Sequence, residues 1–181
     1  MPEKSQRIFN QELQQILDRN FTLRQRVISP DVPDDLKQMI QQNLKESNDK
    51  VTGMQRRAEF DSALSDLREK GITHRVVIID LNNLGGINKE MEKVGKGHEG
   101  ANIVLSSIGD QIKNGAYKLE GMAYRIGGDE FGIITPIRNP NQISKEMQSI
   151  QKDIARIVKK YNFETIPHPK HDGLPTGGGQ I

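Results

Sequence analysis

The chain contains no cysteine, no apolar run of membrane-spanning length and almost no net charge. Without cysteine no disulfide framework can form, which fits a reducing compartment, and we expect a cytoplasmic protein. The first 30 residues are polar and lack the apolar core of a signal peptide. The formal net charge of +2 gives no electrostatic argument for nucleic acid or a membrane as a partner. We therefore expect neither.

The composition that remains is typical of a soluble globular protein. The 181 residues are 34% hydrophobic and 28% charged, which suffices for one domain with a sizeable core and an extension. No internal repeat is visible in the sequence. The question is then which residues carry chemistry.

Residues 124–135 are the most informative stretch, because apolar residues flank the step Gly127-Gly128-Asp129-Glu130. The pattern predicts two short strands joined by a tight turn, in which glycine tolerates a positive φ. Adjacent carboxylates at the tip of such a turn can bind a hard cation, and the glycines leave room for a phosphate.

A third acid fits the same site. The β-branched run from Arg75 to Asp80 predicts a buried central strand over 75–81, and Asp80 ends it. We expect Asp80 to face Asp129 across neighbouring strands. Carboxylates that converge in this way on a divalent cation and a nucleoside triphosphate form the site of two-metal phosphoryl transfer.

At this point the chain resembles the GGDEF domain, the catalytic module of diguanylate cyclases. Four blocks occur in the family's order: Asp49–Met54 is similar to D-x-L-T-G-L, Asp80–Asn88 to D-x-D-x-F-K-x-I-N, Gly97–Asn102 to G-H-x-x-G-D, and Arg125–Phe131 contains the signature itself. The resemblance implies an α+β fold with a palm-like, mostly antiparallel central sheet flanked by helices. It divides the chain into an N-terminal helical extension, 1–48, and a GGDEF-like domain, 49–181, that is short at its C-terminal end relative to the family.

The resemblance also implies an activity. Two GTP molecules, each held by one subunit of a homodimer, would be condensed to cyclic di-GMP and pyrophosphate with Mg²⁺ or Mn²⁺ as cofactor. The metal-binding positions would be Asp80, Leu81 and Asp129. Asp129 and Glu130 would be the catalytic residues, with Glu130 as a base or a second ligand. For Asp80 the alternative is a strand-end residue that caps the next turn.

The nucleotide would be bound by a larger set of residues. By resemblance this set comprises Asn83, Leu84, Gly85, Asn88, Asn102, Gly127 and Gly128. Gly85 replaces the family's lysine, so a phosphate-binding cation is missing. Asn102 replaces an aspartate that accepts twice from guanine, and an amide offers one acceptor and one donor instead. That pattern also suits adenine, so ATP is a second candidate substrate; alternatively, Asn102 is only a helix-start residue.

Two further segments depart from the family. Lys89–Lys96 stands as an insertion near the nucleotide pocket, and we interpret it as a lid or a looser loop. The inhibitory product site, R-x-x-D, falls at Lys118–Gly121, where the aspartate is missing, so product inhibition through it is not expected. His98 falls on the family histidine, which we interpret as structural.

The remaining pattern alternates helices and strands. We expect helices over 5–20 and from Asp34, a helix over 55–70 stopped by Gly71, helices over 99–113 and 141–160, and a hairpin over 122–135. A short edge strand is predicted near Thr176–Ile181. The two N-terminal helices are a hairpin packed on the domain or a stalk for dimerisation or signal input.

Three functions stay open from the sequence. The first is the diguanylate cyclase-type enzyme. The second is a degenerate GGDEF domain that binds nucleotide or a protein without catalysis, favoured by Gly85 and Asn102. The third is a related palm domain that uses ATP.

Overall fold

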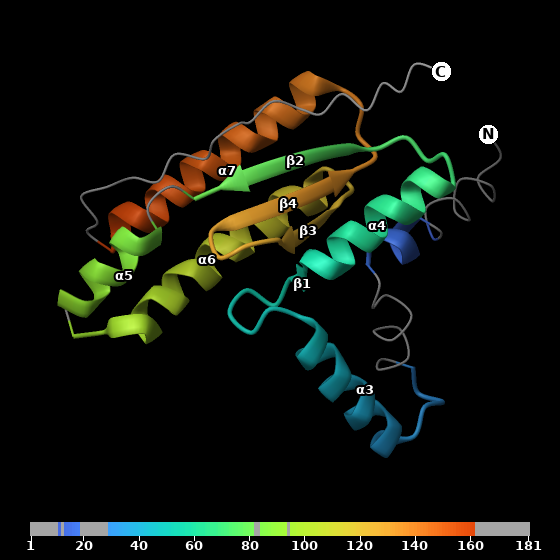
Figure 1. Ribbon diagram of the computed structural model, residues 1–181, viewed down its shortest axis with the longest axis horizontal. Helices are drawn as coiled ribbons and strands as arrows, with labels where there is room; N and C mark the ends of the chain where they lie inside the picture. The colour runs from blue at the N-terminus through green and yellow to red at the C-terminus, as the bar shows by residue number, and fades with distance from the viewer. Residues whose placement is uncertain (1–10, 12, 19–28, 82–83, 94, 162–181) are drawn as a thin grey trace.

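A computed structural model describes residues 11, 13–18, 29–81, 84–93 and 95–161 (Figure 1). Residues 13–17 are helical, and nine elements follow: α3 (Asp34–Ser47), β1 (Gln55–Arg56), α4 (Arg57–Glu69), β2 (Arg75–Asp80), α5 (Leu84–Lys93), α6 (Gly97–Lys118), β3 (Met122–Arg125), β4 (Glu130–Thr135) and α7 (Pro140–Lys160). The mixed helix-and-strand fold predicted from the sequence is confirmed.

The strands form one four-stranded sheet in the order β1-β3-β4-β2. β3 and β4 are the predicted hairpin, β2 pairs antiparallel with β4, and β1 adds to β3 in parallel. The predicted central strand and hairpin are therefore confirmed. The two-residue strand β1 was missed, because Gln55-Arg56 is too short to show alternation and we assigned it to the following helix.

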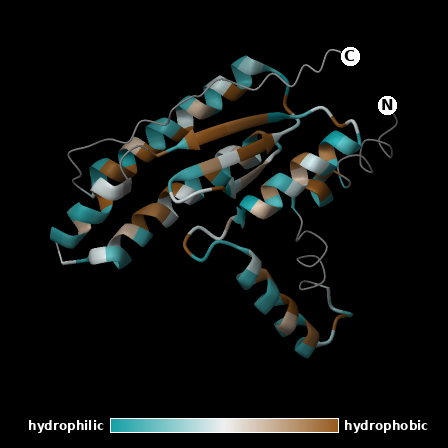
Figure 2. Ribbon diagram, in the orientation of Figure 1, coloured by the Kyte–Doolittle hydropathy of each residue, from teal (hydrophilic) through white to brown (hydrophobic). Residues whose placement is uncertain are grey.

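The two faces of the sheet are covered differently (Figure 1). Alternate residues of β2 show the division, since Val77 and Ile79 belong to one apolar cluster whereas Val76 and Ile78 belong to the other. The first cluster lies under α5, α6 and α7, and the second under α4 and residues 13–17. Figure 2 shows the brown, apolar strands enclosed between these layers.

The two long helices of the first face agree with the sequence. The predicted inward residues of α6 are all buried: Ala101, Val104, Leu105, Ile108 and Ile112. α7 begins where the side chain of Asn139 accepts from the backbone N–H of Asn141 at 3.0 Å, with Pro140 in the first turn. α6 is longer at both ends than the predicted 99–113.

The segment Lys89–Lys96 is not the lid or looser loop that we expected. α5 continues through it to Lys93, because Ile87 and Met91, one turn apart, are both buried against α6. The helix then closes with a hydrogen bond from Lys96 N to Met91 O at 2.8 Å, next to Gly95 at φ +72°. The connection to α6 is therefore short.

The N-terminal region divides into two parts. Leu13, Ile16 and Leu17 are buried on the second face of the sheet, where the hydroxyl of Tyr124 donates to Leu17 O. The predicted second helix is confirmed as α3, which projects away from the sheet (Figure 1). The rest of the predicted helix 5–20, apart from residues 11 and 13–18, lies outside the described residues, as does the edge strand near Thr176–Ile181.

Helix α4 ends as the sequence predicted. Gly71 has φ +62°, and the bonds from Gly71 N to Arg68 O and from Ile72 N to Leu67 O close the last turn. Among the described residues, no helix is both long and apolar enough to cross a membrane.

Candidate active site

The acidic residues meet at one end of the sheet. Asp80 ends β2 and is the register partner of Glu130, the first residue of β4. The next residue, Leu81, donates its N–H to the carbonyl of Asp129 at 2.9 Å. The acid directly opposite Asp80 is thus Glu130, and Asp129 is its neighbour in the turn, one residue from the pairing that we expected.

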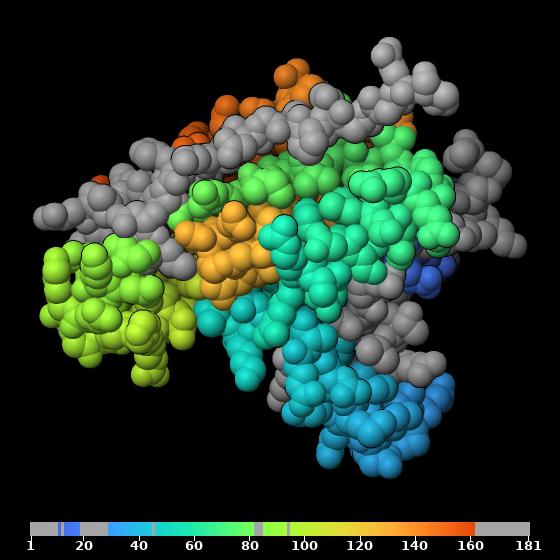
Figure 3. All heavy atoms as spheres, viewed as in Figure 1, coloured from blue at the N-terminus to red at the C-terminus, as the bar shows by residue number. Residues whose placement is uncertain are grey.

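The side chains of this group are accessible. Asp80 and Asp129 are half-buried and Glu130 is exposed. Register partners in an antiparallel pair point to the same face, so Asp80 and Glu130 emerge on the face that carries α4. Figure 3 shows the turn, in orange, on the surface between the green α5–α6 region and the teal α4. The site straddles the end of the sheet.

The glycines of the turn provide room that a side chain would fill, and they do not adopt a positive φ. Neither Gly127 nor Gly128 has a positive φ, which corrects our expectation for this turn. A Cβ on Gly127 would lie 2.7 Å from Oε2 of Glu130, so a larger residue there would require the exposed Glu130 side chain to move. At Gly128 a Cβ would meet nothing within 4 Å, and the backbone there is open. Both bonds from Ile126 N and Gly127 N to Glu130 O close the hairpin.

A partly buried ion pair supports the turn. Arg125, at the end of β3, donates from Nη1 to Oδ1 of Asp49 at 2.9 Å and from Nη2 to the carbonyl of Gly128 at 2.7 Å. The same Asp49 oxygen accepts from the N–H and the hydroxyl of Thr52, each at 2.8 Å. Burial alone would raise the pKa of Asp49, but the bonds from Thr52 and Arg125 together hold it below its ordinary value.

Sequence reasoning missed this pair. Both residues belong to blocks that we identified, but they are 76 positions apart. The only signal was that an arginine and an aspartate sit next to the two turn-forming stretches, which gives no contact by itself.

The predicted nucleotide-binding residues of α5 and α6 belong to the helices that cover the opposite face of the sheet from α4. Leu84 begins α5, Gly85 is exposed and Asn88 is half-buried on the same helix. Asn83 lies outside the described residues. Asn102 is exposed in the second turn of α6, which begins at Gly97, so the helix-start interpretation of Asn102 is wrong.

The two helices that carry these residues are closely packed. A Cβ on Gly100 would lie 2.8 Å from Sδ of Met91, so glycine is needed where α6 crosses α5. His98, which we interpreted as structural, is exposed in the first turn of α6. The structure thus fixes the helix pair, and leaves the polar side chains on its surface.

Within the part of the chain that the structure describes, no three or more His, Cys, Asp or Glu residues are grouped to hold a metal ion. Mg²⁺ is usually bound by one or two carboxylates together with waters and substrate phosphates, rather than by a complete protein cage. Asp80 and Asp129 fit that kind of site.

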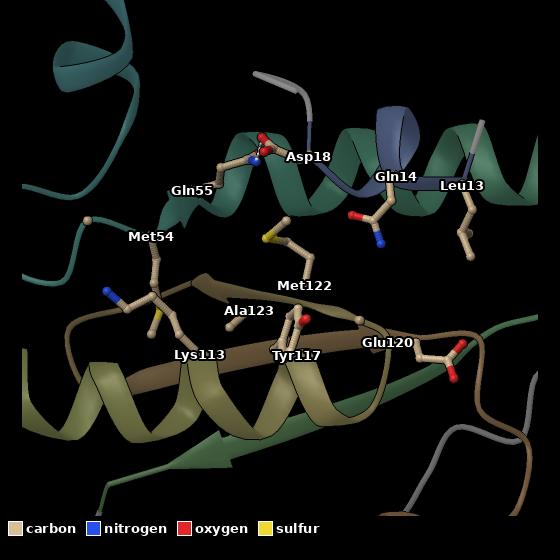
Figure 4. Close-up of a pocket in the computed structure, with 12 residues that line it drawn as sticks. Leu13, Gln14, Asp18, Met54, Gln55, Lys113, Tyr117, Glu120, Met122 and Ala123 are labelled. Atoms are coloured by element: carbon tan, nitrogen blue, oxygen red, sulfur yellow. Dashed lines mark hydrogen bonds between the residues drawn. The ribbon is translucent and has the colours of Figure 1, made fainter. Parts of the chain in front are cut away.

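A separate cavity of about 840 Å³ opens at the opposite edge of the sheet (Figure 4). Residues 13–18, β1, β3 and the end of α6 surround it, and a bond from Gln55 to Asp18 crosses its rim. Glu120 and Gly121, from the segment Lys118–Gly121, line its floor. A Cβ on Gly121 would lie 2.3 Å from the carbonyl oxygen of Ile134, so this position has no room for an aspartate. Sequence reasoning did not find the cavity.

The comparisons with known proteins agree with this fold. The chain belongs to the GGDEF family, since residues 46–170 match the model of the family "Diguanylate cyclase, GGDEF domain". The probable diguanylate cyclase DgcJ of Escherichia coli (strain K12) is 31% identical over 129 residues, which are 63% of this chain. The chain spans only 25% of the length of DgcJ.

Solved structures show the same fold. The coiled coil and GGDEF domain of DgcB from Caulobacter crescentus, in complex with c-di-GMP, superposes with a TM-score of 0.56 at 21% identity, over 68% of this chain and 64% of that one. The S helix-GGDEF-EAL structure of LapD from Vibrio cholerae, bound to c-di-GMP, has a TM-score of 0.54 at 27% identity, over 68% of this chain and 29% of that one.

Proposed function

We propose that the chain is a diguanylate cyclase-type nucleotidyltransferase, which condenses two GTP molecules to cyclic di-GMP and pyrophosphate. The observation that supports this is the meeting of Asp80, Asp129 and Glu130 at one end of the β2–β4 pair, in a chain of this family. Each subunit of a homodimer would hold one GTP, with the two sites facing each other.

Asp80 and Asp129, with Leu81 directly after Asp80, would hold Mg²⁺ or Mn²⁺ together with the triphosphate. The ions would neutralise the charge of the phosphates and lower the pKa of the 3′-hydroxyl. The backbone at the start of α5, Leu84 and Gly85, would bind phosphate oxygens, because the N–H groups of a helix N-terminus favour anions. Gly127 and Gly128 would leave the turn open for the same phosphates.

The chain's own groups would then move a proton and orient the reactants. Glu130 accepts the proton of the 3′-hydroxyl. The 3′-oxygen forms a bond to the α-phosphorus of the partner's GTP, while the bond from that phosphorus to the β-phosphate bridging oxygen breaks and pyrophosphate leaves. The same step in the other direction closes the ring. Asn88 and Asn102 would orient the base.

A second candidate is a nucleotide-binding module without turnover, with GTP or ATP as ligand. It is favoured by Gly85, whose exposed position offers no side-chain cation to the triphosphate. Both candidates predict metal-dependent nucleotide binding, and only the first predicts a cyclic product.

The deciding experiment is incubation with GTP, ATP or both, with Mg²⁺ or Mn²⁺, followed by mass analysis of the products. Cyclic di-GMP and pyrophosphate from the wild type, with none from Glu130→Gln, support the cyclase. Binding of nucleotide with no product from any mixture supports the module. Asp153→Asn on α7 is the matched control, because Asp153 lies outside β2 and the hairpin and its carboxylate pairs with Arg156.

A further inference from the structure

The peptide groups on the two sides of Asp129 are each held by a different part of the chain. The carbonyl of the preceding residue, Gly128, accepts from Nη2 of Arg125 at 2.7 Å. The carbonyl of Asp129 itself accepts from the N–H of Leu81 at 2.9 Å. Because a peptide group is planar, fixing these two carbonyls fixes the backbone on both sides of the Asp129 side chain.

The turn needs such support. Gly127 and Gly128 precede Asp129, and glycine loses more conformational freedom on folding than any other residue. Gly128 is also open on its Cβ side, so side-chain packing does not hold it. Without the two bonds, the backbone at Asp129 would sample several orientations, and its carboxylate with it.

Arg125 can act as a support because it is itself fixed. Its side chain is 13% exposed and that of Asp49 is 18% exposed, so the ion pair between them is largely shielded from water. Asp49 sits in a loop that the bonds from Asp49 N to Met54 O and from Gly53 N to Asp49 O close at 2.7 and 2.8 Å. The planar guanidinium can bond Asp49 and Gly128 at once, from two nitrogens.

We infer that Arg125 is a positioning residue for Asp129, that Asp49 is its anchor, and that the pair sets the affinity of the hairpin for a divalent cation. The inference rests on the proposed function only in taking Asp129 as a metal ligand. A residue that orients a metal ligand from outside the coordination sphere is worth about tenfold or more in metal affinity.

The test uses five variants of the full chain, with Asp129→Asn as the variant that loses the ligand, and one probe, Mn²⁺ titrated in the presence of GTP at low temperature. Arg125→Gln removes both bonds, and Asp49→Asn loosens the anchor. Arg125→Lys keeps the charge beside Asp49 but cannot bond both partners in the same fork. The matched control is Arg57→Gln, because Arg57 also reaches a hairpin carbonyl, Ile126 O, but at 3.5 Å and from an exposed position.

The expected result is an order. Arg125→Gln raises the apparent dissociation constant of Mn²⁺ about tenfold or more, Arg125→Lys and Asp49→Asn raise it less, and Arg57→Gln changes it less than about twofold. Equal Mn²⁺ affinity in Arg125→Gln and wild type, while Asp129→Asn loses binding, overturns the positioning role and leaves the proposed function standing. Partial retention in Arg125→Lys also separates positioning from a loss of folding.

A second measurement does not depend on metal or nucleotide. Amide hydrogen exchange reports the bond from Leu81 N to Asp129 O directly. We expect faster exchange at Leu81 in Arg125→Gln than in Arg57→Gln, with the central amides of β2 unchanged. If Mn²⁺ binds neither the wild type nor any variant, Asp129 has no role in metal binding. The exchange rate of the Leu81 amide alone then decides whether Arg125 holds the turn. Unchanged exchange at Leu81 then rejects it.

Discussion

The two sides of the candidate site are built in different ways. On the hairpin side, Asp80, Asp129 and Glu130 are placed by sheet register and by backbone bonds, with Arg125 beneath them. On the helix side, Asn88 and Asn102 lie on the surfaces of α5 and α6, where packing fixes the helix but not the polar side chain. The comparison teaches that the fold fixes the positions of the acids, whereas the proposed base contacts would depend on the identity of exposed or half-buried side chains.

The largest effect is expected at the hairpin. Asp129→Asn should abolish metal-dependent GTP binding, because it removes the charge of one of the two carboxylates proposed to bind the metal. Calorimetry with GTP and Mn²⁺ measures this, with Asp153→Asn as the control that should bind like the wild type. Unchanged affinity in Asp129→Asn would remove the metal role from the hairpin.

The next effect concerns Glu120 and Gly121, the two residues directly before β3. Gly121→Asp should not create a product-inhibition site but should lower the free energy of unfolding by at least about 2 kcal/mol, because its Cβ collides with the backbone of β4. The neighbouring Glu120 has φ 53°, so Glu120→Gly should be neutral or stabilise by up to about 1 kcal/mol. Denaturant melts of both variants check the opposite signs. Tight, Lys118-dependent cyclic di-GMP binding by the wild type would contradict the absence of an inhibition site.

On the helix side, we expect a change in the hydrogen-bonding groups of one exposed side chain to alter nucleotide preference. Asn102→Asp restores two acceptors for guanine, and we expect the preference for GTP over ATP to rise by roughly ten- to a hundredfold, or about 1–3 kcal/mol. Asn114→Asp, also exposed on α6 but farther along the helix, is the matched control. Affinities for both nucleotides with the same metal measure the effect. If the wild type already prefers GTP more than about a hundredfold and the ratio does not move, Asn102 does not contact the base.

The smallest effect concerns pH. The pKa of Asp49 is lowered in the folded chain, so its ionised form stabilises the fold above the unfolded pKa of about 3.9. That contribution is lost as pH falls below this value and through the folded pKa. We expect Asp49→Asn to have a free energy of unfolding lower than that of the wild type by on the order of 1 kcal/mol at neutral pH. This difference should become smaller in acid. Melts at several pH values measure it, and a gap that widens in acid would contradict the assignment.

Much of the fold was predictable because it follows periodicity. The β-branched run of β2, the hairpin and the amphipathic helices α6 and α7 all carry a pattern of period two or 3.6 that packing then obeys. The helical conformation of Lys89–Lys93 was missed, because we interpreted Lys89–Lys96 only as an insertion relative to the family. The helical spacing of Ile87 and Met91, which are both buried, already indicated a helix.

The position of the three acids at one end of the sheet was predictable, but their arrangement there was not. Local sequence identified Asp80, Asp129 and Glu130, but register decided that Glu130 lies opposite Asp80. The role of Gly127 depends on where the Glu130 side chain folds, and the contact of Arg125 with Asp49 joins distant segments. Such facts arise only when the chain is packed. GTP, the metal and the homodimer remain predictions.

The bond from the Tyr124 hydroxyl to Leu17 O has a practical consequence for shortening the chain. Tyr124 is fully buried and packs edge-on against Phe60 at 5.3 Å between ring centroids. A chain begun at Asp49 would leave that hydroxyl without its acceptor and would open the apolar surface that Leu13, Ile16 and Leu17 cover. Leu13, Ile16 and Leu17 thus form part of the protein's interior, and a chain trimmed to the four sequence blocks would be more prone to aggregate.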